Sequence, residues 1–142
     1  FAPRAAHPEH LARHRLADIA LDTHHHNGGV TTLDALWAGV PVVTIAGAAH
    51  SARTGASILS AIELPELICN DLSGYEALAR NLAHDGEGLA ELRTTLAIKR
   101  DSAPLFDVTR LARHLETAYQ MMFDAWREGL APGTFRVPAL PK

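Results

Sequence analysis

The sequence predicts an α/β fold in which a Rossmann-like parallel sheet carries helices on both faces. Three short apolar segments, at 18–22, 42–45 and 67–69, alternate with helix-like segments along the chain. Such alternation is typical of parallel sheets that are buried on both sides. A long amphipathic segment at about 107–128 follows the last strand. The chain has 142 residues, of which 47% are hydrophobic, and this suits one domain with a substantial core.

The first part of the chain holds two expected helices and a glycine-rich turn. Residues 8–15 begin with a proline, which is tolerated in the first turn of a helix. The turn at 27–29 follows the first strand, and a helix is expected from about 31 to 38. A glycine and then a proline come directly after this helix and would end it.

The rest of the chain continues the alternation of strands and helices. Its expected elements are a strand at 42–45, a helix at 51–62, a strand at 67–69, a helix at 72–83, a helix at 89–100 and a final helix at 107–128. The strand at 42–45 is a β-branched run. Asn70 or Asp71 can cap the helix after the third strand, and the glycine-rich residues 86–88 interrupt the pattern beyond it.

The final helix has the clearest pattern, because its apolar residues recur at steps of three and four. This apolar stripe consists of Val108, Leu111, Leu115, Tyr119, Met122 and Trp126. Trp37 and Trp126 are both interpreted as core residues. The expected regions are a partial Rossmann-like domain at 1–105, the long helix at 106–130 and an irregular tail at 131–142.

Composition and charge argue against several classes of partner and location. The net charge of −3 gives no electrostatic basis for binding nucleic acid or an anionic membrane. The sequence contains no apolar run of roughly 20 residues, as a membrane span requires, and no signal-peptide pattern. The single cysteine, Cys69, indicates a reducing compartment, so a cytoplasmic location is expected. The chain starts at Phe1 rather than Met and its expected sheet is thin, which favours a fragment of a larger protein.

The most informative stretch is DTHHHNGGVTTLDALWAGVP, residues 22–41, where the first expected strand ends. In α/β folds, ligands bind beyond the carboxyl ends of the strands, and glycines let a ligand approach the backbone closely. The next helix offers free N–H groups and a dipole that favours anions, together with the hydroxyls of Thr31 and Thr32. Asp34, one turn later, can accept ribose hydroxyls. A glycine turn with a threonine cap also occurs at strand–helix junctions that bind nothing, so both interpretations stay open here.

Three adjacent histidines, His24 to His26, precede the glycine turn but are not predicted to bind a metal. Zinc ligands usually come from separated positions, and adjacent side chains of an extended segment point to alternating faces. These histidines are therefore interpreted as loop residues near a pocket. His10 and His14 lie four residues apart and share a helix face that could hold a metal, but no third ligand is evident.

Three longer segments, LADIALDTHHHNGGVTTLDALWAGVPVVTIAG, SARTGASIL and SAPLFD, occur in this order along the chain. Together they resemble the C-terminal catalytic half of the O-linked N-acetylglucosamine (O-GlcNAc) transferases. These are glycosyltransferases with tetratricopeptide repeats, and the plant SPINDLY proteins are their relatives. The resemblance covers residues 1 to about 130, and the segment LDALWAGVPVVT is most similar to bacterial members.

The resemblance implies the GT-B architecture, in which two Rossmann-like domains bind the nucleotide-sugar mainly through the second. It implies an inverting enzyme, without a metal or other cofactor, that moves N-acetylglucosamine from UDP-GlcNAc to Ser or Thr hydroxyls of acceptor proteins. A helix N-terminus and threonine hydroxyls can stabilise the departing diphosphate in place of a cation. The catalytic groups, the first GT-B domain and the repeats would lie upstream. No catalytic base is therefore expected within this chain, and the final helix would pack towards that first domain.

The resemblance also implies a set of site residues. The nucleotide-sugar-binding residues would be Ala5, His7, His10, Gly28, Gly29, Val30, Thr31, Thr32, Asp34 and Arg53. Asp34 matches the family's ribose-binding aspartate. The family's His-Thr-Thr at the helix start then falls on Gly29, Val30 and Thr31, of which only the last is identical.

Further matches lie outside this helix start. His10 matches a histidine that stacks on the base, and Ala5 matches a position whose backbone binds the uracil edge. His7 stands where the family has a lysine, and Arg53 matches a segment near the sugar site. Two alternatives stay open. The donor could be GDP-fucose, as the SPINDLY likeness allows, or the chain could be a non-catalytic nucleotide-binding or protein-interaction module, as the changed residues at the helix start allow.

Overall fold

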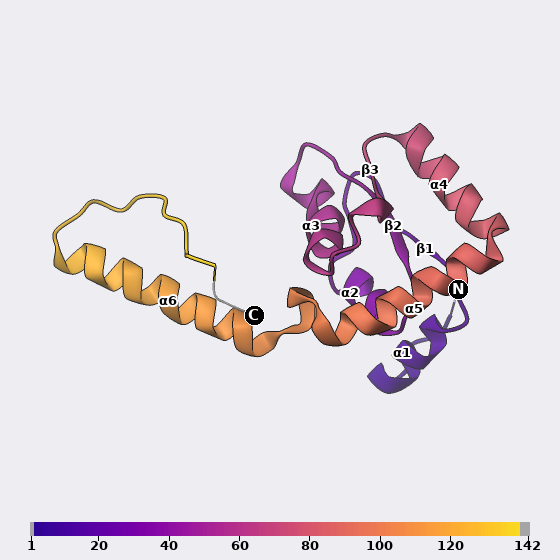
Figure 1. Cartoon of the computed structure of the whole chain (residues 1–142), viewed down its shortest axis with the longest axis horizontal. Helices are drawn as coiled ribbons and strands as arrows, with labels where there is room; N and C mark the ends of the chain where they lie inside the picture. Colours follow the sequence, from indigo (N-terminus) through magenta and orange to yellow (C-terminus); the bar gives the residue numbers. More distant parts are fainter. Residues whose placement is uncertain (1, 140–142) are drawn as a thin grey trace. The chain divides into compact units, whose positions relative to one another are not determined.

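The computed structural model describes residues 2–139, so Phe1 and the last three residues of the expected tail lie outside this range. The described chain forms two compact units, the first ending at Leu105 and the second starting at Phe106. Figure 1 labels their helices and strands. None of the helices in this range has both the length and the apolarity that crossing a membrane requires.

A three-stranded parallel sheet forms the centre of the first unit. Its strands are β1 (Ala20–Leu21), β2 (Val42–Ile45) and β3 (Ile68–Cys69). Its helices are α1 (His7–His14), α2 (Val30–Trp37), α3 (Thr54–Ala61), α4 (Leu72–His84) and α5 (Gly86–Ser102). The strands pair in the order β1-β2-β3, with Ala20 opposite Val42 and Thr44 opposite Ile68. The parallel α/β sheet expected from the sequence is therefore confirmed.

Helices cover both faces of the central strand. Val43 and Ile45 of β2 form a core cluster with Cys69 of β3, and side chains of α4 pack against this cluster. Thr44 points to the opposite face, because successive side chains of a strand alternate, and there it meets Gly55 of α3. Figure 1 accordingly shows β2 between α3 and α4.

The deepest part of the core joins α2, α3 and α5. Its fully buried side chains include Leu36, Leu59, Ile62, Leu64, Leu67 and Leu96. Trp37, in contrast, is 46% exposed, and its ring centre lies 5.4 Å from the guanidinium carbon of Arg100. The interpretation of Trp37 as a core residue is therefore wrong, because its ring serves as a surface partner for a cation on α5.

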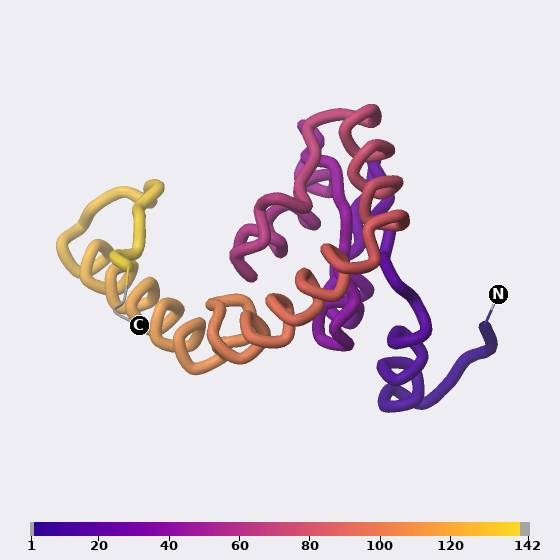
Figure 2. The backbone as a smooth tube through the Cα atoms, turned by 45° about the vertical axis from the view of Figure 1, so that its right-hand side comes forward, coloured from indigo at the N-terminus to yellow at the C-terminus, as the bar shows by residue number. Residues whose placement is uncertain are grey.

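Two expected helix patterns differ from the structure. The segment at 51–62 is divided into a 3-10 turn, His50–Ala52, and the helix α3. The expected break between two helices is present, but it lies at Asp85, between α4 and α5, and residues 86–88 form the first turn of α5. The reason is that the Asp85 carboxylate accepts the N–H of Gly88 at 2.9 Å and caps the helix. Figure 2 shows α4 and α5 as successive coils that meet at a bend.

The second unit consists of α6 (Val108–Arg127) and a tail without regular structure as far as it is described. Asp107 caps α6 by accepting the N–H of Arg110 at 2.8 Å. The expected apolar stripe is present but exposed, and Trp126, at 72% exposed, is wrongly interpreted as a core residue. The tail turns back along α6 (Figures 1 and 2). A hollow of about 240 Å³ between them is lined by residues that include Met122, Trp126, Leu130 and Phe135.

Candidate functional site

The candidate site lies at the carboxyl end of β1, where residues 22–29 lead into α2. Residues 22–29 are referred to as the turn from here on. The N–H of Leu33 donates to the carbonyl of Gly29 at 3.0 Å, which is the first bond of the helical ladder. The N–H groups that precede Leu33 in α2 have no helical partner, and they lie at the edge of the sheet where ligands of α/β proteins bind.

The Asp22 carboxylate is the centre of a hydrogen-bond network within the turn. Its Oδ1 accepts the N–H of Gly28 at 2.7 Å and the N–H of Thr23 at 2.9 Å. Its Oδ2 accepts the hydroxyl of Thr44 at 2.7 Å. The Asp22 carbonyl accepts the hydroxyl of Tyr75 at 2.9 Å, and burial followed by the nearby Asp22 charge raises the pKa of that hydroxyl. The turn is thereby attached to both β2 and α4.

Asn27 is a second anchor of the turn and is almost fully buried. Its side-chain N–H donates to the carbonyl of Thr23 at 2.8 Å, and its Oδ1 accepts the N–H of Gly55 at 3.1 Å. The Asn27 backbone N–H donates to the carbonyl of Ser51 at 2.8 Å. These bonds connect the turn to the start of α3.

The two glycines of the turn have different surroundings. A Cβ at Gly28 would lie 2.6 Å from the hydroxyl oxygens of both Thr31 and Thr32, so the packing at this position requires a glycine. A Cβ at Gly29 would meet no atom within 4 Å. Gly28 therefore shapes the turn, whereas Gly29 leaves open space at the start of α2.

Thr31 and Thr32 bring two hydroxyls to the first turn of α2. Within residues 2–139, neither hydroxyl makes a side-chain hydrogen bond. Thr32 is only 4% exposed, but its hydroxyl oxygen does not belong to the buried unpaired atoms of the described range, so it is open to the adjacent hollow and can meet a ligand there. Both threonines line a hollow of about 190 Å³ with Asp22. Val30, which precedes them, is 72% exposed.

Asp34 lies one turn into α2 and faces two histidines of α1. Its Oδ1 is 3.6 Å from His7 Nε2, and its Oδ2 is 3.6 Å from His10 Nε2. The rings of His10 and His14 meet edge-on with their centroids 4.6 Å apart, which confirms that they share a helix face. Ala5 and His10 line an open hollow of about 460 Å³ beside α1. The structure thus gathers four of the expected site residues, Ala5, His7, His10 and Asp34, at the junction of α1 and α2.

The three adjacent histidines are arranged differently from the prediction. Their side chains were expected to alternate as in an extended segment, but the rings of His24 and His25 stack with centroids 4.6 Å apart. The expectation is wrong because residues 24–26 form a bend. Across the described range, 2–139, no group of three His, Cys, Asp or Glu side chains is arranged to hold a metal ion.

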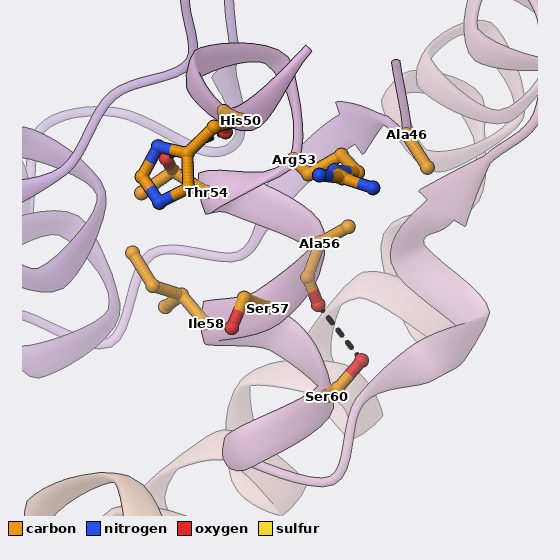
Figure 3. A pocket seen from close by; sticks show the side chains of 8 residues that line it. All are labelled: Ala46, His50, Arg53, Thr54, Ala56, Ser57, Ile58 and Ser60. Atoms are coloured by element: carbon orange, nitrogen blue, oxygen red, sulfur yellow. Dashed lines mark hydrogen bonds between the residues drawn. The ribbon is translucent and has the colours of Figure 1, made fainter. Parts of the chain in front are cut away.

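Arg53 lies apart from the turn, at the start of α3. It lines an open hollow of about 520 Å³ together with His50 and several hydroxyl side chains of α3. Figure 3 shows its guanidinium pointing towards Ala46 and away from the His50 ring. None of the described residues 22–34 lines this hollow, so Arg53 belongs to a neighbouring pocket rather than to the one at α2.

Three residues that organise the site were missed by reasoning from sequence. They are Asp22, Asn27 and Thr44, all of which hold the turn through hydrogen bonds. Some signal was present, because an acidic residue directly follows a strand and an asparagine directly precedes the glycine pair. Thr44 is also the single hydroxyl residue within a buried apolar strand.

Comparisons with known proteins give matches over most of the chain. The profile of the family described as Glycosyl transferase family 41 matches residues 1–115. A rice protein (Oryza sativa subsp. japonica) named "Probable UDP-N-acetylglucosamine--peptide N-acetylglucosaminyltransferase SPINDLY" is 36% identical over 132 residues. A Caenorhabditis elegans protein named "UDP-N-acetylglucosamine--peptide N-acetylglucosaminyltransferase" is 35% identical over 130 residues.

These matches span a small part of each relative. They cover 93% of this chain and 14% of the rice protein, and 92% of this chain and 11% of the nematode protein. A solved structure of a mutant O-GlcNAc transferase from Thermobaculum terrenum superposes with a TM-score of 0.80 at 36% identity. That match covers 90% of this chain and 24% of the solved chain. The parallel sheet and its helices therefore have a close structural counterpart.

Proposed function

Because this chain belongs to glycosyl transferase family 41, we propose that it forms the donor-binding part of an inverting, metal-independent glycosyltransferase. In this proposal the donor is UDP-GlcNAc and the acceptors are Ser and Thr hydroxyls of proteins. The names of the rice and nematode relatives support the choice of donor. The observation that carries the proposal is that the hydroxyls of Thr31 and Thr32, which have no side-chain partner within residues 2–139, line one hollow at the start of the helix that bears the Asp34 carboxylate.

In the proposed complex the diphosphate binds at the first turn of α2. Free N–H groups and the partial positive charge of the helix N-terminus favour an anion there, and the hydroxyls of Thr31 and Thr32 add two donors. The N–H of Gly28 already donates to Asp22, so the phosphate contacts begin at Gly29. Negative charge grows on the diphosphate as the bond to the sugar breaks. Donors fixed before the reaction stabilise that charge without a cation.

The nucleoside occupies the junction of α1 and α2 in this proposal. Each Asp34 oxygen has further lone pairs beside its histidine contact, so the carboxylate can accept ribose hydroxyls. His10 offers a ring for stacking on the base, and the backbone of Ala5, in the adjacent hollow, binds the base edge. His7 adds a second polar group next to the ribose. Arg53 and its separate hollow are assigned to the sugar side of the donor.

The remaining parts of the proposed reaction come from outside this chain. No catalytic base is assigned among residues 2–139. The base, the first GT-B domain and the tetratricopeptide repeats that contact the acceptor are assigned to other parts of the same protein. The small share of each relative that the chain covers fits this division, since 14% of the rice protein corresponds to the donor-binding part alone.

Nucleotide binding to the complete protein tests the proposal. The protein is titrated calorimetrically with UDP, GDP and UDP-GlcNAc, with and without EDTA. Binding of UDP and UDP-GlcNAc that is unaffected by EDTA is the expected result. Binding of GDP but not UDP would instead support a GDP-fucose donor. Binding of none of the three would support a non-catalytic module, and loss of binding with EDTA would contradict the metal-free mechanism.

Two substitutions test the location of the site. Thr31→Ala and Asp34→Ala each remove a hydrogen bond to a charged or polar part of the donor, which costs about 1–3 kcal/mol. Such losses correspond to a UDP affinity that is roughly 5- to 150-fold weaker. Thr94→Ala is the matched control, because the Thr94 hydroxyl donates to the Ala90 carbonyl within α5, away from α2. If both site variants bound UDP as tightly as Thr94→Ala, the assignment to α2 would be wrong.

A further inference from the structure

We propose that Asp22 is a positioning residue for donor binding, whose carboxylate holds the turn in the shape that presents Thr31 and Thr32 to the ligand. This inference rests on the proposed function, since it concerns how the same site is built. Asp22 itself makes no contact with the donor in this proposal. Its effect reaches the ligand through Gly28 and the two threonines.

Three donors from different parts of the chain converge on the Asp22 carboxylate. The N–H groups of Thr23 and Gly28 come from the two ends of the turn, and the hydroxyl of Thr44 comes from β2. An ionised carboxylate accepts through both oxygens, whereas an asparagine in the same place accepts through one. Bonds to an ionised acceptor are also roughly twice as strong as bonds between neutral groups. The shape of the turn therefore depends on a carboxylate at this position.

Close packing around the carboxylate removes alternative arrangements of the turn. A Cβ at Gly55 would overlap Asp22 Oδ2 and would lie 2.6 Å from the Thr44 hydroxyl oxygen. A Cβ at Gly28 would lie 3.5 Å from Asp22 Oδ1. The turn and α3 thus approach the same carboxylate from two sides, and each does so with a glycine.

The link from Asp22 to the ligand passes through Gly28. The Gly28 backbone is fixed by Asp22 and packs closely against the hydroxyls of Thr31 and Thr32. Thr32 is buried, so its hydroxyl cannot be redirected freely when the turn shifts. A misplacement of about 1 Å caused by a distant substitution can lower a reaction rate on the order of a hundredfold, because binding and reacting groups must be held in the right geometry. Loss of the Asp22 carboxylate should therefore weaken donor binding, although Asp22 is not in contact with the donor.

The test compares Asp22→Ala, Asp22→Asn and Asp71→Ala in the complete protein. Asp71 is a matched control, because its carboxylate also holds a backbone N–H, that of Gly74 at 2.7 Å, but it caps α4 instead of the turn. Asp22→Ala should weaken UDP binding about tenfold or more and speed hydrogen exchange in residues 23–30. Asp22→Asn should recover part of both losses, and Asp71→Ala should change neither.

Several outcomes would overturn the inference. Unchanged UDP affinity in Asp22→Ala would do so, and so would equal losses in Asp22→Ala and Asp71→Ala. If Asp22→Ala does not fold, Thr44→Val takes its place, since it removes one donor without a change of size. Thr44→Val should weaken UDP binding by a smaller factor than the about tenfold or more expected for Asp22→Ala. An unchanged UDP affinity in Thr44→Val would again contradict the inference. Failure of the proposed function looks different, because the wild-type protein then binds no UDP. In that case hydrogen exchange of residues 23–30 alone decides whether Asp22 holds the turn.

Discussion

Replacing Gly55 with alanine should destabilise the protein, although alanine is the better helix former. Gly55 lies in the first turn of α3, where the change alone would add about 0.5–1 kcal/mol of stability. The new methyl group, however, would overlap Asp22 Oδ2 and lie 2.6 Å from the Thr44 hydroxyl oxygen. Overpacking of a filled site costs about 1–3 kcal/mol, and loss of the bond between Thr44 and the carboxylate costs about 1.5–3 kcal/mol. The expected net loss is about 1.5–5.5 kcal/mol after the helix gain is subtracted.

Gly74→Ala is the matched comparison for this substitution. Gly74 also lies in the first turn of a helix, α4, but a Cβ there would be 3.4 Å from the Asp71 carboxylate and 4.0 Å from the Cys69 Cβ. These are ordinary contacts, so Gly74→Ala should stabilise the protein by about 0.5–1 kcal/mol. Calorimetric melting and UDP titration of both variants measure the two effects. If Gly55→Ala melts no lower than wild type or keeps its full UDP affinity, the reasoning about the Asp22 network is refuted.

Three other substitutions and one chemical treatment have expected outcomes. Gly28→Ala should weaken UDP binding and lower the melting temperature, because its methyl group would displace two hydroxyls, whereas Gly29→Ala should leave the melting temperature nearly unchanged. Hydrogen bonds from Gly74 and then Ser73 lower the pKa of Asp71. The ionised Asp71 therefore stabilises the fold above the pKa of the unfolded carboxyl, and this contribution is lost as the pH falls. In Asp71→Asn, the melting temperature should accordingly decrease less steeply below about pH 4 than it does in the wild type. Burial raises the pKa of the Cys69 thiol, so iodoacetamide should alkylate it more slowly than an unfolded chain, and urea should remove the difference.

Local patterns in the sequence were sufficient to predict most of the fold. The β-branched run at 42–45 is a strand with those bounds, and Asp71 caps the helix that follows β3. The final helix was predicted to within about one residue at each end, because its apolar repeat extends over five turns. The break expected at 86–88 lies at Asp85 instead, because the Asp85 carboxylate accepts the N–H of Gly88 and lets the two glycines form the first turn of α5.

The architecture of the site was less accessible from the sequence. The Asp22 network joins residues 22 and 28 to residue 44 of the next strand, and no local pattern encodes a pair so far apart. The buried position of Asn27 likewise depends on its bond to Gly55, 28 residues away. The family likeness pointed to Thr31 and Asp34, which occupy the start of α2, but not to the groups that hold that helix start in place.

The chain contains two tryptophans, Trp37 and Trp126, and they lie in different units. Trp37 ends α2 beside the Arg100 guanidinium, and Trp126 lies on α6 with its ring centroid 5.7 Å from that of Phe123. Indole emission responds to adjacent charge and to water, so each ring is an optical reporter of its own surroundings. Replacing Trp126 with phenylalanine leaves the emission of this chain to report on the unit that contains α2, and replacing Trp37 leaves it to report on α6.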